Sequence, residues 1–521
     1  MLGCSGRVDV TMGWIVAIVL SASMAAPGMA DQPESENAAL PNIIVILADD
    51  LGYGDVQPNQ PESPLKTPAF NRLAREGVVF EDAHSGSGVC TPTRYGLICG
   101  RYCWRTSLKR GVLGGYSKPL IQPGRQTIAT VLKKAGYHTG CVGKWHLGLG
   151  WQWRGKEPDN INFFGIAGQK DSVDYSQPLT DGPLQHGFDE CLIIPASLDM
   201  SPYVFIENDR VTQPPKSVID GRPFPAFYRK GEISADFQHI DCLGHLADRA
   251  CEFIAQRAAT GEPFFLYFPM PAPHKPVIPT PEFQGASQLG PYGDFVLQVD
   301  STVNRVLKAI DQAGIADNTL LVVTSDNGSF MHRYDKPDQR DHTDDDSIQG
   351  YRATSHRANG PLRGTKADVF EAGHRVPFMV RWPAQIKAGG KVQNTVCLTD
   401  LLATCAAAAN VEFDQVSAED SFSFLPLVVS SADAADYRRP PVINHSANGM
   451  FAIRQGPWKL ILGNGSGGRA QPRGKPFTKP YQLYDLSQDL GESNNLWEQQ
   501  TSKASELESL FVRLAHDDHQ Q

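Results

Sequence analysis

The stretch Asn42-Ile-Ile-Val-Ile-Leu-Ala48, followed directly by Asp49-Asp50, decides the fold of this 521-residue chain. It is a continuous apolar run of strand length and is rich in β-branched residues. A strand that is apolar on both faces belongs in the middle of a mostly parallel sheet that helices cover. Open sheets of this kind bind ligands outside the carboxyl ends of their strands. The stretch therefore predicts an α/β fold with a functional site beside Asp49 and Asp50.

Helices and apolar strands alternate along the chain beyond this run. Thr67 as N-cap, Pro68 in the first turn and a closing Gly77 predict one helix. Further helices are predicted over residues 127–135, 295–313 and 398–408, and strands over residues 138–143, 263–268, 319–324 and 375–381. The alternation predicts a large mixed, mostly parallel sheet sandwiched by helices.

The character of the sequence changes near residue 440. Residues 450–462 and 482–486 have the pattern of antiparallel strands with a Gly-rich loop between them, and a helix is predicted over residues 504–515. We therefore predict an α/β domain over residues 41–439 and a smaller C-terminal α+β domain over residues 440–521. The smaller domain is built on a short antiparallel sheet.

The N-terminal residues 1–30 have the features of a secretory signal peptide. Arg7 precedes an apolar run from Trp14 to Leu20, and small residues follow as far as Ala30. The run is too short to span a membrane, and residues 31–40 are predicted to be a flexible leader. We expect export to a periplasm or outside the cell after cleavage near Ala30. The net charge of −9 argues against a nucleic-acid partner.

Ten cysteines are present, and Cys4 lies within the predicted signal peptide. Export permits disulfides. Cys99 and Cys103 are four residues apart, but no second Cys or His pair with zinc-ligand spacing accompanies them. We expect these two to be buried or disulfide-bonded thiols.

Two acidic motifs follow buried strands and suggest a metal site. Asp49-Asp50 ends the first strand, and Asp326-Asn327 ends the strand predicted over residues 319–324. Paired carboxylates are costly to bury together without a cation. Ligation by oxygen atoms alone suits Ca²⁺ or Mg²⁺ better than zinc, and of the two we favour Ca²⁺. Taken singly, each motif is more typical of a turn than of a metal site.

The run Cys90-Thr-Pro-Thr-Arg-Tyr-Gly-Leu-Ile-Cys-Gly-Arg101 contains Cys-x-Pro-x-Arg followed by Gly-Arg. This pattern resembles the signature of the formylglycine-dependent type I sulfatases, the arylsulfatase A-like members of the alkaline phosphatase superfamily. The resemblance implies an alkaline-phosphatase-like fold and oxidation of Cys90 to formylglycine by a formylglycine-generating enzyme. The aldehyde hydrate would then be the nucleophile and form a covalent sulfo-enzyme intermediate. Without the resemblance, Cys90 would be read as a buried thiol or half of a disulfide.

Other motifs continue the resemblance and imply roles for further residues. Gly143-Lys-Trp-His-Leu-Gly148 matches a second sulfatase signature, in which Lys144 binds sulfate and His146 acts as a base. Lys144 and His146 lie two residues apart, which puts them on one face if the chain is extended there. The resemblance also implies the remaining site residues: Arg94 at the hydrated aldehyde, His274 at the leaving group, Lys366 at the sulfate, Ser197 as a further substrate contact, and Asp49, Asp50, Cys90, Asp326 and Asn327 at the cation.

The long insertion over residues 329–361 carries many charged side chains. Arg352, His356 and Arg357 are candidates for gripping a polyanionic substrate. The alternative is a solvated charged loop. Insertions over residues 162–183 and 211–231 could shape the rim of the site.

Together these observations favour an exported, calcium-dependent sulfatase that cleaves sulfate esters, with a sulfated carbohydrate as the expected substrate. Two alternatives remain at this point. One is a phosphonate or phosphate ester hydrolase of the same superfamily, and the other is a non-catalytic protein that binds sulfated glycans.

Overall fold

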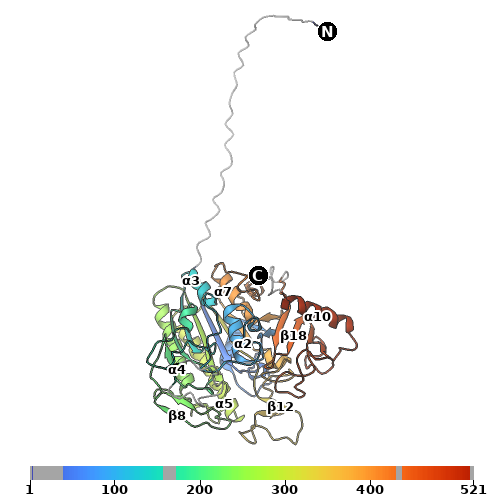
Figure 1. Cartoon of the computed structure of the whole chain (residues 1–521), viewed down its shortest axis with the longest axis horizontal. Coiled ribbons are helices and arrows are strands. Elements are labelled where there is room, and N and C mark those ends of the chain that lie inside the picture. The colour runs from blue at the N-terminus through green and yellow to red at the C-terminus, as the bar shows by residue number, and fades with distance from the viewer. Residues whose placement is uncertain (1–2, 4–38, 156–171, 430–436, 517–521) are drawn as a thin grey trace. The chain divides into compact units, whose positions relative to one another are not determined.

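The computed structural model describes residue 3 and residues 39–155, 172–429 and 437–516 (Figure 1). The predicted signal peptide, most of the predicted leader and much of the predicted insertion at 162–183 lie outside the described residues. From residue 40 onward, the described residues form one compact unit. The predicted boundary near residue 440 stays a prediction.

A ten-stranded mixed sheet runs through this unit in the order β15-β2-β14-β11-β1-β10-β4-β5-β6-β7. Its strands are β1 (Asn42–Asp49), β2 (Val78–Phe80), β4 (His138–Lys144), β5 (Glu190–Ile194), β6 (Ile206–Glu207), β7 (Arg210–Val211), β10 (Phe264–Pro273), β11 (Thr319–Ser325), β14 (Phe378–Arg381) and β15 (Gly390–Val392). The five central strands β11, β1, β10, β4 and β5 pair in parallel. On the flanks, β14 and β6 pair antiparallel with their neighbours. The predicted large, mixed and mostly parallel sheet is confirmed.

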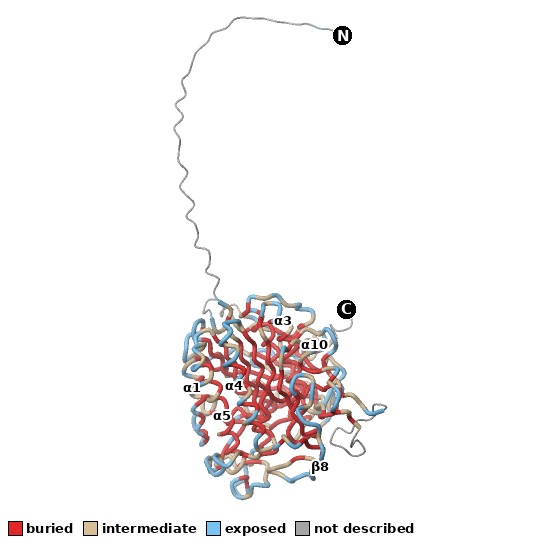
Figure 2. Tube along the Cα trace, turned by 90° about the vertical axis from the view of Figure 1, so that its left-hand side faces the viewer, coloured by how far each residue is buried: buried red, intermediate tan, exposed pale blue. Residues whose placement is uncertain are grey.

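Strand β1 lies in the middle of the sheet because both of its faces are apolar. Ile43, Val45 and Leu47 point into one core cluster, whereas Ile44, Ile46 and Ala48 point into the cluster on the opposite face. All six side chains are fully buried. Figure 2 shows this buried interior beneath a more exposed outer surface. The period of two along a strand therefore sends alternate residues to two separate helical layers.

Helices cover both faces of the sheet, which gives three layers. One core cluster contains residues of α2 (Cys90–Cys99), α3 (Ile128–Lys134) and α7 (Leu401–Ala408). The opposite cluster contains residues of α1 (Pro68–Glu76), α4 (Cys242–Ala258) and α5 (Gly290–Gln312). The sequence predicted α1, α3, α5 and α7 to within a few residues, but α4 was not predicted.

The remaining short elements lie in the connections. The two-stranded pairs are β3 (Ala83–His84) with β16 (Val396–Cys397), β8 (Ser217–Ile219) with β9 (Gly231–Ile233), and β12 (His332–Tyr334) with β13 (Gly350–Arg352). The short helices are α6 (Glu371–His374) and α8 (Pro426–Val429), and the 3-10 turns are η1 (Tyr53–Asp55), η2 (Cys103–Arg105), η3 (Pro183–His186) and η4 (Leu398–Asp400). The charged insertion at 329–361 thus contains its own strand pair.

The C-terminal region is built on a four-stranded antiparallel sheet, as predicted. Its strands are β17 (Val442–His445), β18 (Phe451–Gln455), β19 (Trp458–Ile461) and β20 (Gln482–Asp485). Helix α10 (Thr501–His516) packs on this sheet, seen on the right in Figure 1. Val369 and Phe370 of the α/β part are buried against Met450, Ala452 and Ile461 of the sheet.

The nine cysteines from Cys90 to Cys405 are all free thiols, and eight of them are buried. Cys99 and Cys103 are therefore buried thiols rather than disulfide partners. Within the described part of the chain, no helix is both long and apolar enough to cross a membrane.

His445, in β17, makes the stability of the fold depend on pH. The side chain is 1% exposed, and burial lowers the pKa of His445 to about 4 although the Ser446 carbonyl accepts a hydrogen bond from its ring. In the unfolded chain a histidine pKa is about 6.5. Between about pH 6.5 and 4 the unfolded state therefore binds more protons, and stability falls as the pH falls. The difference amounts to roughly 3 kcal/mol.

We predict that His445→Gln removes this loss, so that unfolding free energies at pH 7 and pH 4 lie closer together in the variant than in the parent protein. Urea unfolding across that range measures the effect. An identical pH dependence in both proteins would show that His445 is not its source.

Candidate active site

The carboxyl ends of four neighbouring strands deliver the polar side chains of one buried site. Strand β1 ends at Asp49 and is followed by Asp50, β4 ends at Lys144, β10 precedes His274, and β11 precedes Asp326. Each of these side chains is at most 4% exposed. The parallel pairing of the strands puts their ends at one edge of the sheet, which is where the sequence placed the site.

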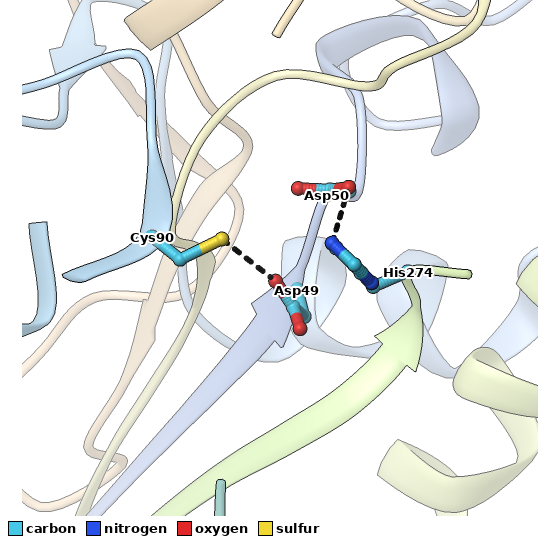
Figure 3. Close-up of side chains that lie close together, drawn as sticks. All are labelled: Asp49, Asp50, Cys90 and His274. Carbon is cyan, nitrogen blue, oxygen red and sulfur yellow. Dashed lines mark hydrogen bonds and ion pairs between the residues drawn. The ribbon is translucent and has the colours of Figure 1, made fainter. Parts of the chain in front are cut away.

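Cys90 approaches the same edge from the first residue of α2. Its Sγ lies 3.5 Å from Asp49 Oδ1, a contact drawn as a dashed line in Figure 3, and 3.4 Å from Lys366 Nζ. The backbone N–H groups of the first helical turn favour a negative charge at this position. Burial, however, raises the pKa of the Cys90 thiol far above its usual range. The unmodified side chain is therefore protonated at neutral pH and is a poor nucleophile.

Three carboxylates of the site face three cations. Lys144 Nζ lies 2.5 Å from Asp49 Oδ2, and Lys366 Nζ lies 2.5 Å from Asp50 Oδ1. The Arg94 guanidinium contacts Asp326 Oδ2 through both Nη2, at 2.9 Å, and Nε, at 3.1 Å. Arg94 Nη1 also donates to the Lys144 carbonyl at 2.9 Å, so the pairs form a single network.

Burial and charge shift the three carboxyl groups in different directions. Burial acts to raise the pKa of Asp49, but neighbouring positive charges, that of Lys144 first, hold it well below its usual range. Burial raises the pKa of Asp50, and the neighbouring Asp49 charge adds to this. Burial, and then the Asp49 charge, raise the pKa of Asp326 to about 7. Carboxyl groups crowded in this way are stabilised by additional positive charge.

Three residues around the site have left-handed backbone conformations, which residues other than glycine rarely adopt. Asp50 (φ 66°), His146 (φ 57°) and Ala367 (φ 79°) are all left-handed. Such strain persists where the surrounding structure enforces it, and it concentrates at functional sites. Gly328 is required for another reason, because a Cβ there would overlap the Ala372 carbonyl oxygen.

Strand β4 ends at Lys144 and His146 is left-handed, so the extended conformation that would put the two side chains on one face does not reach His146. The left-handed turn at His146 rotates its side chain away from the strand direction. Its Nε2 donates to the Leu113 carbonyl at 2.7 Å, and its buried Nδ1 has no hydrogen-bond partner among the described residues. Burial, with the Lys144 and Arg94 charges, holds the pKa of His146 well below its usual range. The ring is therefore neutral, with an Nδ1 that can accept a proton.

In Figure 3, His274 and Cys90 lie on opposite sides of Asp49. Its Nδ1 lies 2.5 Å from the Lys275 carbonyl, and its Nε2 lies 3.6 Å from Asp50 Oδ2 (Figure 3). Burial, and after it the charge of Lys366, hold the pKa of His274 well below its usual range. Donation from Nδ1 to the carbonyl directs Nε2 into the site.

The residues present fit a hard divalent cation. Potential ligand atoms of Asp49, Asp50, Cys90 and His274 lie within 4.8 Å of one another. Asn327 joins them because its amide nitrogen donates to Asp50 Oδ1 at 2.6 Å, and its own Oδ1 is buried without a hydrogen-bond partner in the described structure. Asp326 Oδ1 accepts from the Asp50 backbone at 3.1 Å. A set of carboxylate and amide oxygens of this kind matches calcium or magnesium chemistry.

The weaker substrate-contact candidates lie in different environments. Ser197 follows β5, close to where the His146 backbone N–H donates to Pro195, and its buried Oγ has no partner among the described residues. Arg352 is partly exposed and pairs with Asp341 and Asp344 at 3.3 and 3.2 Å. Arg357 is exposed. His356 is buried, with Nε2 at 2.7 Å from Asp55 Oδ1, so it faces the interior rather than the rim.

Sequence reasoning missed the network to which His356 belongs. Asp55 Oδ2 accepts from Tyr292 at 2.5 Å and from the Gly52 backbone at 2.8 Å. The Tyr292 hydroxyl in turn lies 2.7 Å from Ser329 Oγ. The Ser329 carbonyl accepts hydrogen bonds from Thr365 and from the Lys366 backbone. The network therefore ties the segment after Asp50 to the segment that carries Lys366. The only signal in the sequence was the position of Asp55 five residues after Asp50.

Comparison with known proteins identifies the class of this site. A family model described as Sulfatase matches residues 41–411. A curated N-acetylgalactosamine-6-O-sulfatase from Bacteroides thetaiotaomicron is 33% identical and covers 91% of this chain and 93% of its own length. Arylsulfatase A from Bos taurus is 29% identical over 93% of this chain and 86% of its own length. The chain belongs to the sulfatase family and is a sulfuric ester hydrolase.

Solved structures agree with this assignment. A structure from a study of glycosaminoglycan metabolism by Bacteroides thetaiotaomicron aligns with a TM-score of 0.76 and 31% identity, covering 92% of this chain and 99% of that one. The PsFucS1 sulfatase from Pseudoalteromonas has a TM-score of 0.67 at 22% identity, covering 91% and 90%, which supports the fold. The resemblance inferred from the sequence motifs is confirmed.

The buried position of His356 predicts that this residue stabilises the fold and does not contact the substrate. His356→Ala removes the hydrogen-bond partner of the buried Asp55 Oδ1, and we expect a loss of about 3 kcal/mol in unfolding free energy because that oxygen is left unsatisfied. The matched control Arg357→Ala removes an exposed side chain and should change stability by less than about 0.5 kcal/mol. Denaturant unfolding of both variants measures this. Equal stability of the two would contradict the buried role of His356.

Proposed function

We propose that this protein is an exported, formylglycine-dependent and calcium-assisted sulfatase that acts on a sulfated carbohydrate. The observation that carries the proposal is the position of Cys90. It begins α2 with its Sγ between the Asp49 carboxylate and the Lys366 ammonium, at distances of 3.5 and 3.4 Å. The features of a signal peptide in residues 1–30 support export.

The raised pKa of Cys90 argues that the encoded thiol is a precursor. Formylglycine at this position supplies an aldehyde hydrate, in which one hydroxyl attacks sulfur and the deprotonation of the other expels sulfate. The neutral His146 with its acceptor Nδ1 is suited to take that proton. Because the neighbouring Lys144 and Arg94 charges oppose protonation of His146, the ring gives the proton up again readily.

Three cations would stabilise the transferring sulfuryl group. Lys366 Nζ contacts the Cys90 side chain directly, Lys144 lies across Asp49, and Arg94 is fixed by Asp326 and by the Lys144 carbonyl. All three are buried, so their fields act on the sulfuryl oxygens with little screening by water. Their positions are set by existing contacts, which reduces the reorganisation needed during the reaction.

His274 is suited to protonate the leaving oxygen. Its Nδ1 is committed to the Lys275 carbonyl, so Nε2 is the atom available inside the site. The low pKa of His274 makes its protonated form a strong acid, which favours transfer to a departing alkoxide. Because the pKa of His274 is low, only a small fraction of the ring is protonated at neutral pH.

Asp49, Asp50, Asp326 and Asn327 would hold the cation, with the side chain at position 90 beside it. We favour Ca²⁺ over Mg²⁺ because calcium accepts irregular sets of carboxylate and amide oxygens, whereas magnesium demands near-octahedral geometry. The cation would add positive charge next to the sulfuryl group.

For the substrate we propose a 6-O-sulfated N-acetylgalactosamine unit. Support comes from the 33% identical relative, an N-acetylgalactosamine-6-O-sulfatase, which aligns over nearly the whole chain. Mammalian N-acetylgalactosamine-6-sulfatases, such as the one from Sus scrofa at 29% identity, align over 86% of it.

Mass spectrometry of the tryptic peptide that contains Cys90 tests the central modification. After co-expression with a formylglycine-generating enzyme, we expect the peptide to carry an aldehyde in place of the thiol. Cys90→Ala should keep the fold and lose turnover of an aryl sulfate and of N-acetylgalactosamine 6-sulfate. An unmodified thiol together with undiminished activity would overturn the proposal. Phosphonate esters turned over faster than both sulfate esters would favour the alternative substrate class.

Thermal unfolding tests the cation site without relying on activity. Saturating Ca²⁺ should raise the Tm of the protein, because a ligand at about 100 times its Kd stabilises the folded state by about 2.7 kcal/mol. Asn327→Ala should reduce the calcium-dependent increase in Tm. Asn464→Ala, in a loop of the C-terminal region, is the matched control and should retain it. A parent protein whose Tm is insensitive to millimolar Ca²⁺ would contradict the site.

A further inference from the structure

The loop that follows β5 carries a buried carboxylate that the proposed chemistry does not use. Asp199 is 2% exposed. Its Oδ2 lies 2.5 Å from Arg229 Nη1, but its Oδ1 has no hydrogen-bond partner among the described residues. A buried carboxylate oxygen without a hydrogen-bond partner is costly, and in a native structure it calls for an explanation. Ser197, two residues earlier, likewise has a buried and unpartnered Oγ.

A chain of contacts leads from Asp199 to the proposed leaving-group histidine. The Arg229 guanidinium carbon lies 5.1 Å from the centre of the Phe227 ring, and Lys275 Nζ lies 4.7 Å from the same centre. Lys275 is the residue after His274, and its carbonyl accepts the His274 Nδ1 hydrogen bond. Cation–π contacts at these distances orient both cations beside Phe227.

The electrostatics of Lys275 agree with this arrangement. Burial lowers the pKa of Lys275 to about 8, and the charges of Arg469 and Lys366 lower it further while Asp199 opposes them. Lys275 is only partly buried. The charges of Lys366, in the sulfate pocket, and of Asp199 thus both act on Lys275.

We infer that Asp199, Arg229 and Lys275 form the subsite for the sugar ring of the sulfate ester, in which Asp199 Oδ1 accepts a hydrogen bond from a sugar hydroxyl. The inference rests on the proposed function and specifies its leaving group. A pyranose presents hydroxyl donors next to its sulfated position, whereas a simple aryl ester presents none to the oxygen of Asp199. A site built to bond a hydroxyl discriminates strongly against substrates that lack it.

Asp199→Asn is a sharp test because Arg229 fixes the orientation of the new amide. The guanidinium donates to the atom at Oδ2, so the amide oxygen occupies that position and the NH₂ group replaces the acceptor Oδ1. The variant exchanges an anionic acceptor for a neutral donor with almost no change in volume. A charge-assisted hydrogen bond contributes about 1.5–3 kcal/mol, which corresponds to a tenfold to hundredfold effect.

The experiment compares kcat/KM for N-acetylgalactosamine 6-sulfate with kcat/KM for 4-nitrophenyl sulfate in the formylglycine-bearing protein. We expect Asp199→Asn to lower the sugar-to-aryl ratio at least tenfold. Asp220→Asn is the matched control, because Asp220 also pairs with a cation, Lys230, but is exposed. It should leave the ratio unchanged. If Asp199→Asn does not fold, Lys275→Gln makes the same comparison, with the same expected direction.

The outcomes separate the two proposals. A parent protein that turns over both esters, with a ratio that neither Asp199→Asn nor Lys275→Gln alters, overturns the sugar subsite and leaves the sulfatase mechanism standing. A parent protein that lacks formylglycine and turns over neither ester overturns the proposed function and the subsite with it.

Discussion

Burying three carboxylates at the ends of parallel strands is the constraint on which the rest of this structure depends. Asp49, Asp50 and Asp326 are fully removed from water, and each is matched by a buried cation supplied by a different segment of the chain. Charges in such surroundings are tolerated only when they are paired and hydrogen-bonded. The same cations are the groups that a sulfuryl transfer needs around its oxygens. The same three cations therefore balance the buried carboxylates and would stabilise the sulfuryl group during the reaction.

The C-terminal region takes part in holding this balance because it supports the segment that carries Lys366. Val369 and Phe370 pack against its sheet. Lys459 of β19 reaches Glu371 at 3.0 Å and Glu492 at 2.8 Å, all of them buried. Removing one partner from a buried group of this kind leaves an uncompensated charge. The smaller sheet thus positions a proposed sulfate-binding lysine from outside the main sheet.

Much of the fold could be predicted, because β1 and its neighbours are apolar on both faces and their ends carry the acidic motifs. Helix α4 was missed, although Leu243, Leu246, Ala247 and Ala250 are buried at helical spacing. Its Cys, Gly and His residues dilute that pattern. The left-handed backbone at His146 was also unpredictable, since few residues other than glycine adopt that conformation and the tertiary contacts enforce it here.

The sequence alone determined the position of the central strand, the residue types at the strand ends and the membership of the sulfatase family. These follow from local periodicity and from short motifs, which need no knowledge of distant contacts. Only the tertiary structure decided which side chains meet. It turned His356 inward onto Asp55, set Lys366 against Cys90 across 276 positions of sequence, and left Asp199 Oδ1 buried without a partner in the described structure. Such contacts depend on how loops from separate strands pack together, and no local pattern encodes that packing.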